Sequence, residues 1–424
     1  EFNPEILIDN VFSILTKIQN NPERFENIFT ELFEKDFQLQ LNDINQLKHG
    51  LLKGLIISVK DLFNVKGYKT RGGSKFLNPD ISLEDAECIS LIRAAGGLLI
   101  GHTNMTELAY SGLGINPHYG TPLNPIYEGA IPGGSTSGGA VSISLDISDI
   151  TIGTDTGGST RIPAAFTGIT GFKPTQDVIS RKGALVLSSS LDSVGLMAKN
   201  VQLCKLGYEV MKNKTKIKKT NFNDVEPNLI IPSNFGFKDI EPKIKSSFNT
   251  AKQKLADNGF NIIEMHIPTL DLYKKVPLWQ FAAVESQTEY FDAYNEKKHL
   301  IDPNIVRRMD RANNVLAVEY NLLLDIREKL IKEFNTFLKN NFLLLPTVTI
   351  YPPLLEDCKD ESYYDEVNLI SLRNTSLANY MNGCSISLPF SKDNNPMGIM
   401  LNGITNNDDQ LLNNSIKVEA VLSK

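Results

Sequence analysis

The spacing of apolar residues changes along the chain, and its first pattern is helical. Between residues 4 and 46, apolar positions recur at intervals of three and four with polar residues between them. This spacing gathers them on one face of a helix and predicts an N-terminal helical layer over residues 1–50. The positions that carry the pattern include Ile8, Val11, Phe12, Leu15, Phe25, Ile28, Phe29 and Leu32.

From Leu51 onward, short apolar runs alternate with helical stretches. The runs LLKGLIISV, GGLLIGHTN and DITIGTD have the length and apolar character of buried strands. Between them, LEDAECISLIRAAG has helical spacing, and GGAVSISL is a helical run of small residues. This alternation predicts an α/β fold in which helices pack on a sheet.

A polar stretch rich in lysine and asparagine, residues 212–228, divides the chain and predicts a surface loop or linker. Beyond it, LIIPSNF, NIIEMHIP and FLLLPTVTI predict strands, and the pattern is helical from about residue 277 to residue 339. We therefore expect helices to dominate the second half of the chain. We find no internal repeat of fixed period in the sequence.

Composition favours a globular protein that acts on small molecules. The 424 residues are 41% hydrophobic and 22% charged, with a mean hydropathy of -0.16 and a net charge of -6. Such a chain can bury a sizeable core, and its charge provides no attraction to nucleic acid or to an anionic membrane. No apolar run reaches the roughly 20 residues of a membrane span. We expect a cytoplasmic protein, or an organellar one if a targeting peptide was removed.

The cysteines predict neither a metal site nor disulfide bonds. Cysteine occurs four times, far apart and without a C-x-x-C pair, so neither zinc nor a disulfide framework is indicated. We interpret the four as reduced, mostly buried thiols. They are Cys88, Cys204, Cys358 and Cys384.

Two glycine-rich strings enclose serines in a short span. They are PGGSTSGG at residues 132–139 and TDTGGSTR at residues 154–161. Because glycine lacks a Cβ, such loops let backbone amides approach either a phosphate or an oxyanion. Neither string is followed by Gly-Lys-Ser/Thr, and no G-x-G-x-x-G opens a helix after a strand, so the phosphate interpretation is disfavoured.

A serine nucleophile also needs a base and oxyanion donors. No serine sits in a G-x-S-x-G elbow, and of the five histidines only His118, in NPHYG, lies in suggestive sequence. We interpret His118 as structural and consider a lysine base instead. Lys60 closes the apolar run GLIISVK, where burial would lower its pKa toward neutrality. Taken alone, a lysine at a strand end more often reaches solvent.

The strings GLIISVKDLFNV, IPGGSTSGGAVS, GTDTGGSTRIPAAFTGITGFKPT and SSSLDSVGLMAKNV together resemble the amidase signature family. The similarity runs from about Gly54 to Val201, with weaker echoes at residues 372–389 and 395–404. It implies a single α/β/α domain over residues 51–424, built around a large twisted mixed sheet. Within that domain we expect a catalytic core at residues 51–211 and a helix-rich remainder at residues 229–424 that shapes the substrate pocket. The family's chemistry needs no cofactor and no metal.

Residue by residue, the resemblance implies a Ser-cisSer-Lys triad. Ser159 takes the place of the nucleophile, Ser135 that of the cis-serine relay and Lys60 that of the base. An acyl-enzyme would form on Ser159, with its oxyanion bound by the backbone N–H groups of residues 156–159, namely Thr156, Gly157, Gly158 and Ser159.

Further residues have supporting parts in this interpretation. Asp155 and Arg161 flank the nucleophile and are expected to hold its loop by ionic or hydrogen-bonding contacts. The stretch NMTELAYSGLG matches one that lines the acyl pocket in relatives, while ordinary helix packing is the alternative for it. Its candidate substrate contacts are Ala109, Tyr110 and Ser111.

Two activities stay open on sequence alone. The first is a free-standing amidase acting on a small-molecule amide, with no direct nucleic-acid or membrane partner and with a homodimer left open. The second is the A subunit of a tRNA-dependent amidotransferase, which would need partner subunits. Such subunits typically carry Arg-Gln-Pro after the nucleophile, whereas this chain has Ile162 between Arg161 and Pro163. That difference favours the free-standing amidase, and the complete triad disfavours a non-catalytic binding module.

Overall fold

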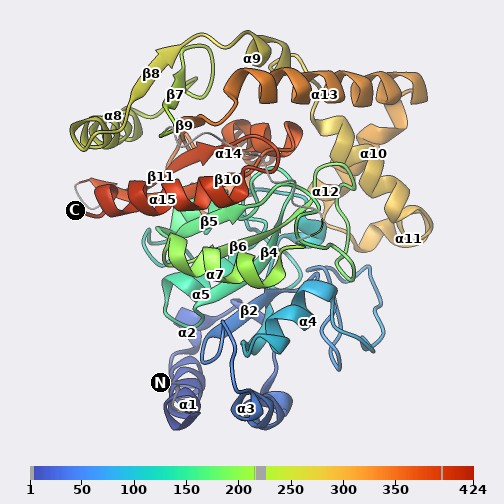
Figure 1. The fold of residues 1–424 in the computed structure, drawn as a ribbon. Coiled ribbons are helices and arrows are strands. Elements are labelled where there is room, and N and C mark those ends of the chain that lie inside the picture. The colour runs from blue at the N-terminus through green and yellow to red at the C-terminus, as the bar shows by residue number, and fades with distance from the viewer. Residues whose placement is uncertain (1–3, 214, 216–225, 393–394) are drawn as a thin grey trace.

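The computed structural model describes residues 4–213, 215, 226–392 and 395–424. Their strands form one eleven-stranded sheet in the order β1-β3-β2-β4-β6-β5-β10-β11-β9-β7-β8. The sheet is mixed. Strand β2 runs parallel to β3 and β4. Strand β6 is antiparallel to β4 and β5, and β10 is antiparallel to β5 and β11. The predicted α/β fold with a large mixed sheet is therefore confirmed (Figure 1).

The strands have the lengths usual in globular proteins. They are β1 (Phe29–Leu32), β2 (Ile56–Lys60), β3 (Leu98–Thr103), β4 (Ile150–Asp155), β5 (Thr170–Lys173), β6 (Ser193–Ala198), β7 (Leu229–Pro232), β8 (Ile262–Met265), β9 (Phe342–Pro346), β10 (Ser385–Lys392) and β11 (Asn395–Asn402).

The helices surround this sheet and extend beyond it. They are α1 (Pro4–Asn20), α2 (Pro22–Phe25), α3 (Phe37–Gln46), α4 (Glu87–Ala94), α5 (Ser137–Ser144), α6 (Arg161–Thr167), α7 (Val201–Met211), α8 (Pro242–Asp257), α9 (Pro268–Tyr273), α10 (Trp279–Glu289), α11 (Phe291–Lys297), α12 (Pro303–Asp310), α13 (Ala317–Leu338), α14 (Glu361–Tyr380) and α15 (Asp408–Leu422). Short 3-10 turns include η2 (Glu107–Ala109) and η4 (Arg311–Asn314).

Helices cover the centre of the sheet on both faces. Every residue of β2, β3, β4, β5 and β6 is buried, and successive side chains of a strand point to opposite faces, so both faces need cover. One layer of contacting helices consists of α4, α7, α8 and α15, and another of α5, α6 and α14. The loops that precede α5 and α6 are thereby held against buried strands.

The two ends of the sheet differ. In Figure 1, α1 and α3 lie at the end that carries the N-terminus, and α9 and α13 lie at the opposite end with β7 and β8. The helices α10, α11 and α12 form a flank to the side of the sheet. The helical pattern predicted for residues 277–339 thus corresponds to α10 through α13, with turns between them.

The N-terminal segment contains an element that the sequence pattern does not reveal. Between its helices, β1 pairs antiparallel with β3, so that Glu31 lies opposite His102. With only four residues, β1 is too short to show an alternation of apolar and polar positions. The boundaries proposed for an N-terminal layer and a catalytic domain stay a prediction.

Other expectations concern single segments. Most of the loop or linker predicted at residues 212–228 lies outside the described residues, which lack 214 and 216–225. All four cysteines are buried and unbridged. Within the described ranges, no helix combines the length and the apolar character that crossing a membrane requires, and no cluster of three or more His, Cys, Asp or Glu residues suits a metal ion.

Candidate active site

The three predicted triad residues come from a strand end and from two loops that open helices. Lys60 is the last residue of β2, which runs parallel to its neighbour β4. Ser135 precedes α5 by two residues, and Ser159, in the loop after β4, precedes α6 by two residues. Because the carboxyl ends of parallel strands meet at one edge of a sheet, Lys60 and the end of β4 lie together.

Lys60 is fully buried and bonded to two hydroxyl groups. Its Nζ donates to Ser135 Oγ at 2.8 Å and to Thr154 Oγ1 at 2.9 Å. Burial lowers the pKa of Lys60 to about 7, against the opposing negative charges of Asp192 and Asp155. Near neutral pH, much of this lysine is therefore uncharged and able to accept a proton.

Backbone hydrogen bonds hold the peptide group between Ser135 and Thr136 at both its carbonyl and its N–H. The Gly134–Ser135 peptide bond is cis. The Thr106 N–H donates to the Ser135 carbonyl at 3.0 Å, and the Thr136 N–H donates to the Ser159 carbonyl at 3.3 Å. A Cβ on Gly134 would lie 2.5 Å from the Gly114 nitrogen, so only glycine fits before Ser135.

Ser159 lies beside a cavity, and its hydroxyl group makes no hydrogen bond with any described residue. Among the described residues, Ser159 Oγ makes no hydrogen bond with Ser135 Oγ. The side chain is almost fully buried, yet Ser159 lines the cavity of about 230 Å³ next to it. The structure thus joins Lys60 to Ser135 directly, and it joins Ser135 to Ser159 through the backbone of Thr136.

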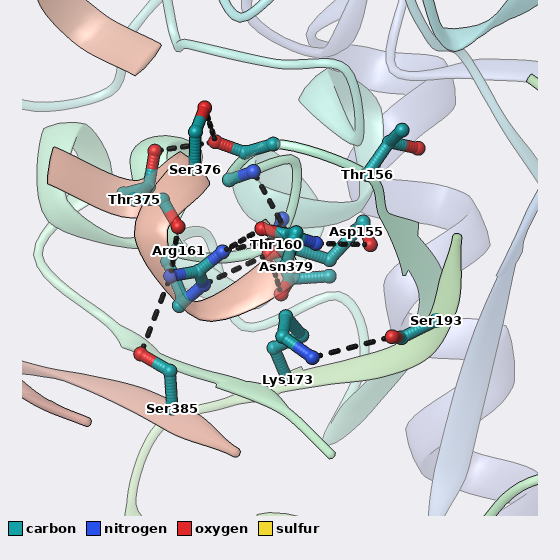
Figure 2. A network of polar contacts seen from close by, with 12 residues as sticks. Asp155, Thr156, Thr160, Arg161, Lys173, Ser193, Thr375, Ser376, Asn379 and Ser385 are labelled. Carbon is teal, nitrogen blue, oxygen red and sulfur yellow. Dashed lines mark hydrogen bonds and ion pairs between the residues drawn. The ribbon is translucent and has the colours of Figure 1, made fainter. Parts of the chain in front are cut away.

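Asp155 and Arg161 bind each other and the backbone of the Ser159 loop (Figure 2). The Asp155 carboxylate accepts from the N–H groups of Gly158 (2.8 Å) and Thr160 (3.1 Å). Arg161 donates to the same carboxylate through Nε at 3.1 Å and through one terminal nitrogen at 2.8 Å, and both side chains are fully buried. Although burial alone would raise the pKa of Asp155, the Arg161 charge and hydrogen bonds hold it well below its ordinary value.

Helix α14 completes this network with residues that the sequence analysis did not single out. The Asn379 amide donates to Asp155 Oδ1 at 3.0 Å and accepts from Arg161 at 2.8 Å, while the Thr375 carbonyl accepts from Arg161 at 2.8 Å. Lys173, also buried, donates to Ser193 Oγ at 3.3 Å near this pair, and burial lowers its pKa to about 8. Thr375 and Asn379 belong to the string LRNTSLANYMNG, which resembles the family more weakly and could have indicated them.

The backbone donors after β4 divide into two groups. The N–H groups of Thr156, Gly157 and Ser159 make no hydrogen bond with any described residue, and these three residues line the cavity. The Gly158 N–H, in contrast with the expectation of an oxyanion donor, is occupied by Asp155. Free N–H groups of residues that line a cavity beside a hydroxyl are candidate donors to a developing negative charge.

The cavity walls come from both halves of the chain. Ala109, Tyr110 and Ser111, the candidate substrate contacts, all line the cavity. The other lining residues were not predicted, and they belong to the loop before β6, to α10, to the α12–η4 segment and to α14. These residues are Leu187, Leu191, Leu278, Trp279, Ala282, Arg308, Arg311, Asn368, Leu369, Leu372, Arg373 and Ser376.

Asp192 is a second buried carboxylate near Lys60. It accepts from Thr156 Oγ1 at 2.6 Å and from the N–H groups of Leu187 (2.9 Å) and Ser188 (3.0 Å). Burial raises the pKa of Asp192 to about 6. Because this pKa is still below 7, Asp192 carries a negative charge near neutral pH, and that charge acts on Lys60. Asp192 belongs to the string SSSLDSVG, part of the resemblance to the family.

His118 lies outside the cavity lining, consistent with its interpretation as structural. Its Nε2 is 3.0 Å from Oε1 of Glu107, a buried residue of η2. Burial favours the uncharged form of Glu107 and raises its pKa, while the hydrogen bonds that Glu107 accepts act to lower that pKa. The histidine thus supports the loop that carries Ala109 rather than acting as a base for Ser159.

Comparison with known proteins identifies one family. The model of the family described as Amidase matches residues 9–412. A 2-amino-5-chloromuconic acid deaminase of Comamonas testosteroni is 30% identical over 88% of this chain and 83% of its own. The A subunit of the glutamyl-tRNA(Gln) amidotransferase of Methanococcus vannielii (strain ATCC 35089 / DSM 1224 / JCM 13029 / OCM 148 / SB) is 29% identical over 98% of this chain and 99% of its own. A crystal structure described as an amidase shares a TM-score of 0.85 and 26% identity, covering 99% of this chain and 96% of that one.

Proposed function

The chain belongs to the amidase family and is an amide-hydrolysing enzyme, and from this premise we propose that it is a free-standing amidase acting through Lys60, Ser135 and Ser159. Its substrate is a small-molecule amide, which it converts to a carboxylic acid and ammonia or an amine. The contact that carries the proposal is the 2.8 Å hydrogen bond between Ser135 Oγ and the Nζ of the buried Lys60. A lysine with a pKa near 7 is suited to accept a proton at neutral pH.

In the acylation step, protons move from Ser159 toward Lys60. The uncharged Lys60 takes the hydroxyl proton of Ser135, which takes that of Ser159 after the Ser159 side chain turns toward it. The Ser159 oxygen bonds to the amide carbonyl carbon, and the carbonyl oxygen becomes an oxyanion. The free N–H groups of Thr156, Gly157 and Ser159 support binding of that oxyanion.

Breakdown of the tetrahedral intermediate completes the acylation step. The carbon–nitrogen bond breaks, and the proton returns through Ser135 to the leaving nitrogen, which departs as ammonia or an amine. Water then loses a proton along the same path and attacks the Ser159 ester, so that the acid is released and Ser159 regains its hydroxyl. Apart from the substrate and this water, the steps use only groups of the chain.

The test uses the purified protein alone on a panel of aliphatic and aryl amides, followed by fluorophosphonate labelling and intact-mass analysis. We expect hydrolysis without tRNA or partner subunits, and one adduct on Ser159. In Ser159→Ala, both signals should vanish. The matched control is Ser137→Ala, which removes a serine of the same glycine-rich string as Ser135 but outside the proposed triad, and it should leave both signals. Full activity of Ser159→Ala would refute the nucleophile.

The likeness to an amidotransferase A subunit over almost the whole chain makes that activity the second candidate. The same preparation separates the two proposals. A protein that releases ammonia from glutamine only with partner subunits and a charged tRNA, and that leaves simple amides intact, has the amidotransferase role. Ile162, the residue after Arg161, favours the free-standing enzyme.

A further inference from the structure

The cavity beside Ser159 has a charge unlike that of the protein around it. The chain as a whole has a net charge of -6. The cavity lining nevertheless includes three arginines and neither aspartate nor glutamate among the described residues. Apart from these arginines, the wall is mainly aliphatic and aromatic. They are Arg308, Arg311 and Arg373.

Two of these arginines already have partners. Arg308 donates to the Tyr110 carbonyl at 2.7 Å and lies 3.3 Å from an oxygen of Asp365. Arg373 donates to the Lys238 carbonyl at 2.6 Å and lies 3.5 Å from Asp239. Their guanidinium groups hold α12 and α14 in place and have less capacity left for a ligand.

Arg311 differs from both. Its side chain makes no hydrogen bond or ion pair with any residue that the structure describes, and its guanidinium carbon lies 3.8 Å from the centre of the Trp279 ring. Stacking on an aromatic face fixes the plane of the guanidinium and leaves its N–H edge open. An arginine presented in this way suits a planar anion, because two parallel N–H groups match the two oxygens of a carboxylate.

We propose that the substrate is an amide that carries a free carboxylate, which Arg311 binds while the amide carbonyl lies at Ser159. This inference rests on the proposed amidase function, because both groups line the same cavity. The apolar part of the substrate packs against aliphatic side chains of the same lining, which include Leu187, Leu278 and Leu372. Arg311 is then a specificity residue that selects anionic amides over neutral ones.

The experiment compares two amides of equal chain length, hexanamide and the monoamide of adipic acid, whose far ends are a methyl group and a carboxylate. We expect wild-type kcat/KM to be higher for the acid amide. Arg311→Met should lower that value about 10- to 100-fold, the range typical of a lost charged hydrogen bond. The loss should fall on KM, and kcat/KM for hexanamide should change little.

Two further variants make the result specific. Arg311→Lys keeps the charge without the planar pair of donors and should restore part of the preference. Arg373→Met removes a partnered arginine from the same wall and should affect the two amides alike. If Arg311→Met reduced activity equally for both amides, or if the wild type showed no preference, the carboxylate site would be refuted.

Binding to the inactive Ser159→Ala protein separates this inference from the proposed function. By calorimetry, the acid amide should bind more tightly than hexanamide, and adding Arg311→Met should remove the difference. Equal binding of the two amides refutes the Arg311 site even if both are hydrolysed. Absence of hydrolysis and of a Ser159 adduct refutes the amidase proposal, whatever the binding shows.

Discussion

The Thr375 hydroxyl donates a hydrogen bond to the Gly157 carbonyl, although the two residues are 218 positions apart in the sequence. Ser376 Oγ donates to the same carbonyl at 3.3 Å. With its carbonyl held by α14, the peptide group after Gly157 is fixed, and the Gly157 N–H stays free beside the cavity. The second half of the chain thus sets the geometry of the loop that carries Ser159.

Gly158→Ala should strongly reduce the activity of the enzyme. Gly158 has a φ of +138°, which disfavours an L side chain, and a Cβ there would lie 2.2 Å from Thr375 Oγ1. The loop must shift to accept it, and a displacement of about 1 Å at a reacting group lowers the rate by about 100-fold. We therefore expect kcat/KM to fall at least about 100-fold, measured on the best amide of the panel.

The control for that variant is Gly259→Ala. Gly259 also has a positive φ, +89°, but a Cβ there would meet nothing within 4 Å. This variant should lose some stability and keep its activity. Equal activities of Gly158→Ala and Gly259→Ala would show that the contact between α14 and the Ser159 loop does not matter for catalysis.

Arg161→Met should strongly destabilise the fold. The variant leaves the Asp155 carboxylate buried without its cationic partner, and breaking a buried ion pair in this way typically costs about 3–5 kcal/mol. Urea unfolding followed by circular dichroism measures the loss. As a control, Lys332→Met breaks an ion pair with Glu328 in which both side chains are largely exposed. This variant should leave the urea concentration at the unfolding midpoint unchanged. Similar unfolding midpoints for both variants would contradict this account of the Asp155–Arg161 pair.

Local sequence was informative where the chemistry lies in contiguous strings. A lysine that closes an apolar run and two glycine–serine strings led to Lys60, Ser135 and Ser159, and the family and the fold class were confirmed. The hydrogen bond between Lys60 and Ser135 agrees with the predicted relay, which stays a prediction until activity is measured. Asp155 and Arg161 were found for the same reason, because they flank Ser159 in the sequence.

The cavity could not be predicted in the same way. Trp279 and Arg311 lie in a motif-poor region, and only the packing of α10 against η4 brings them to the cavity that Ser159 also lines. Helical periodicity identifies the buried face of a helix but does not say which distant loop that face meets. The Gly158 N–H was expected to bind the oxyanion, and sequence could not show otherwise for a related reason. Only the folded loop shows that Asp155 accepts a hydrogen bond from this N–H.

Activity should rise with pH through about 7. Burial lowers the pKa of Lys60 from 10.5 to about 7, and only the uncharged amine accepts a proton. Below that pH, kcat/KM should fall about tenfold per unit, and above it a plateau should follow. The profile is measured with an amide that does not itself ionise. A rise centred near pH 10 would show that Lys60 is not desolvated, and a flat profile would remove it as the base.

The pH dependence of stability checks the same lysine independently of activity. Because the Lys60 pKa is lower in the folded state, the unfolded chain binds more protons between about pH 7 and 10.5, and this group makes stability rise with pH there. The free energy of unfolding should gain up to about 1.4 kcal/mol per pH unit from Lys60. Lys60→Met should lack that gain, so the difference between the two proteins at each pH isolates it.

Asp192→Asn should move the activity profile to lower pH. Burial is the main cause of the low Lys60 pKa, and the negative charge of Asp192 opposes it. Without that charge the protonated form of Lys60 is less favoured, so the Lys60 pKa falls further and the pH of half-maximal activity should move to the acid side.

Asparagine is isosteric with aspartate and can still accept from Thr156 Oγ1 or from the Leu187 and Ser188 N–H groups. The companion variant Thr156→Val removes one of these hydrogen bonds and keeps the charge, so it should leave the profile near pH 7. A shift of equal size in both variants would mean that Asp192 acts on Lys60 through the loop geometry and not through its charge.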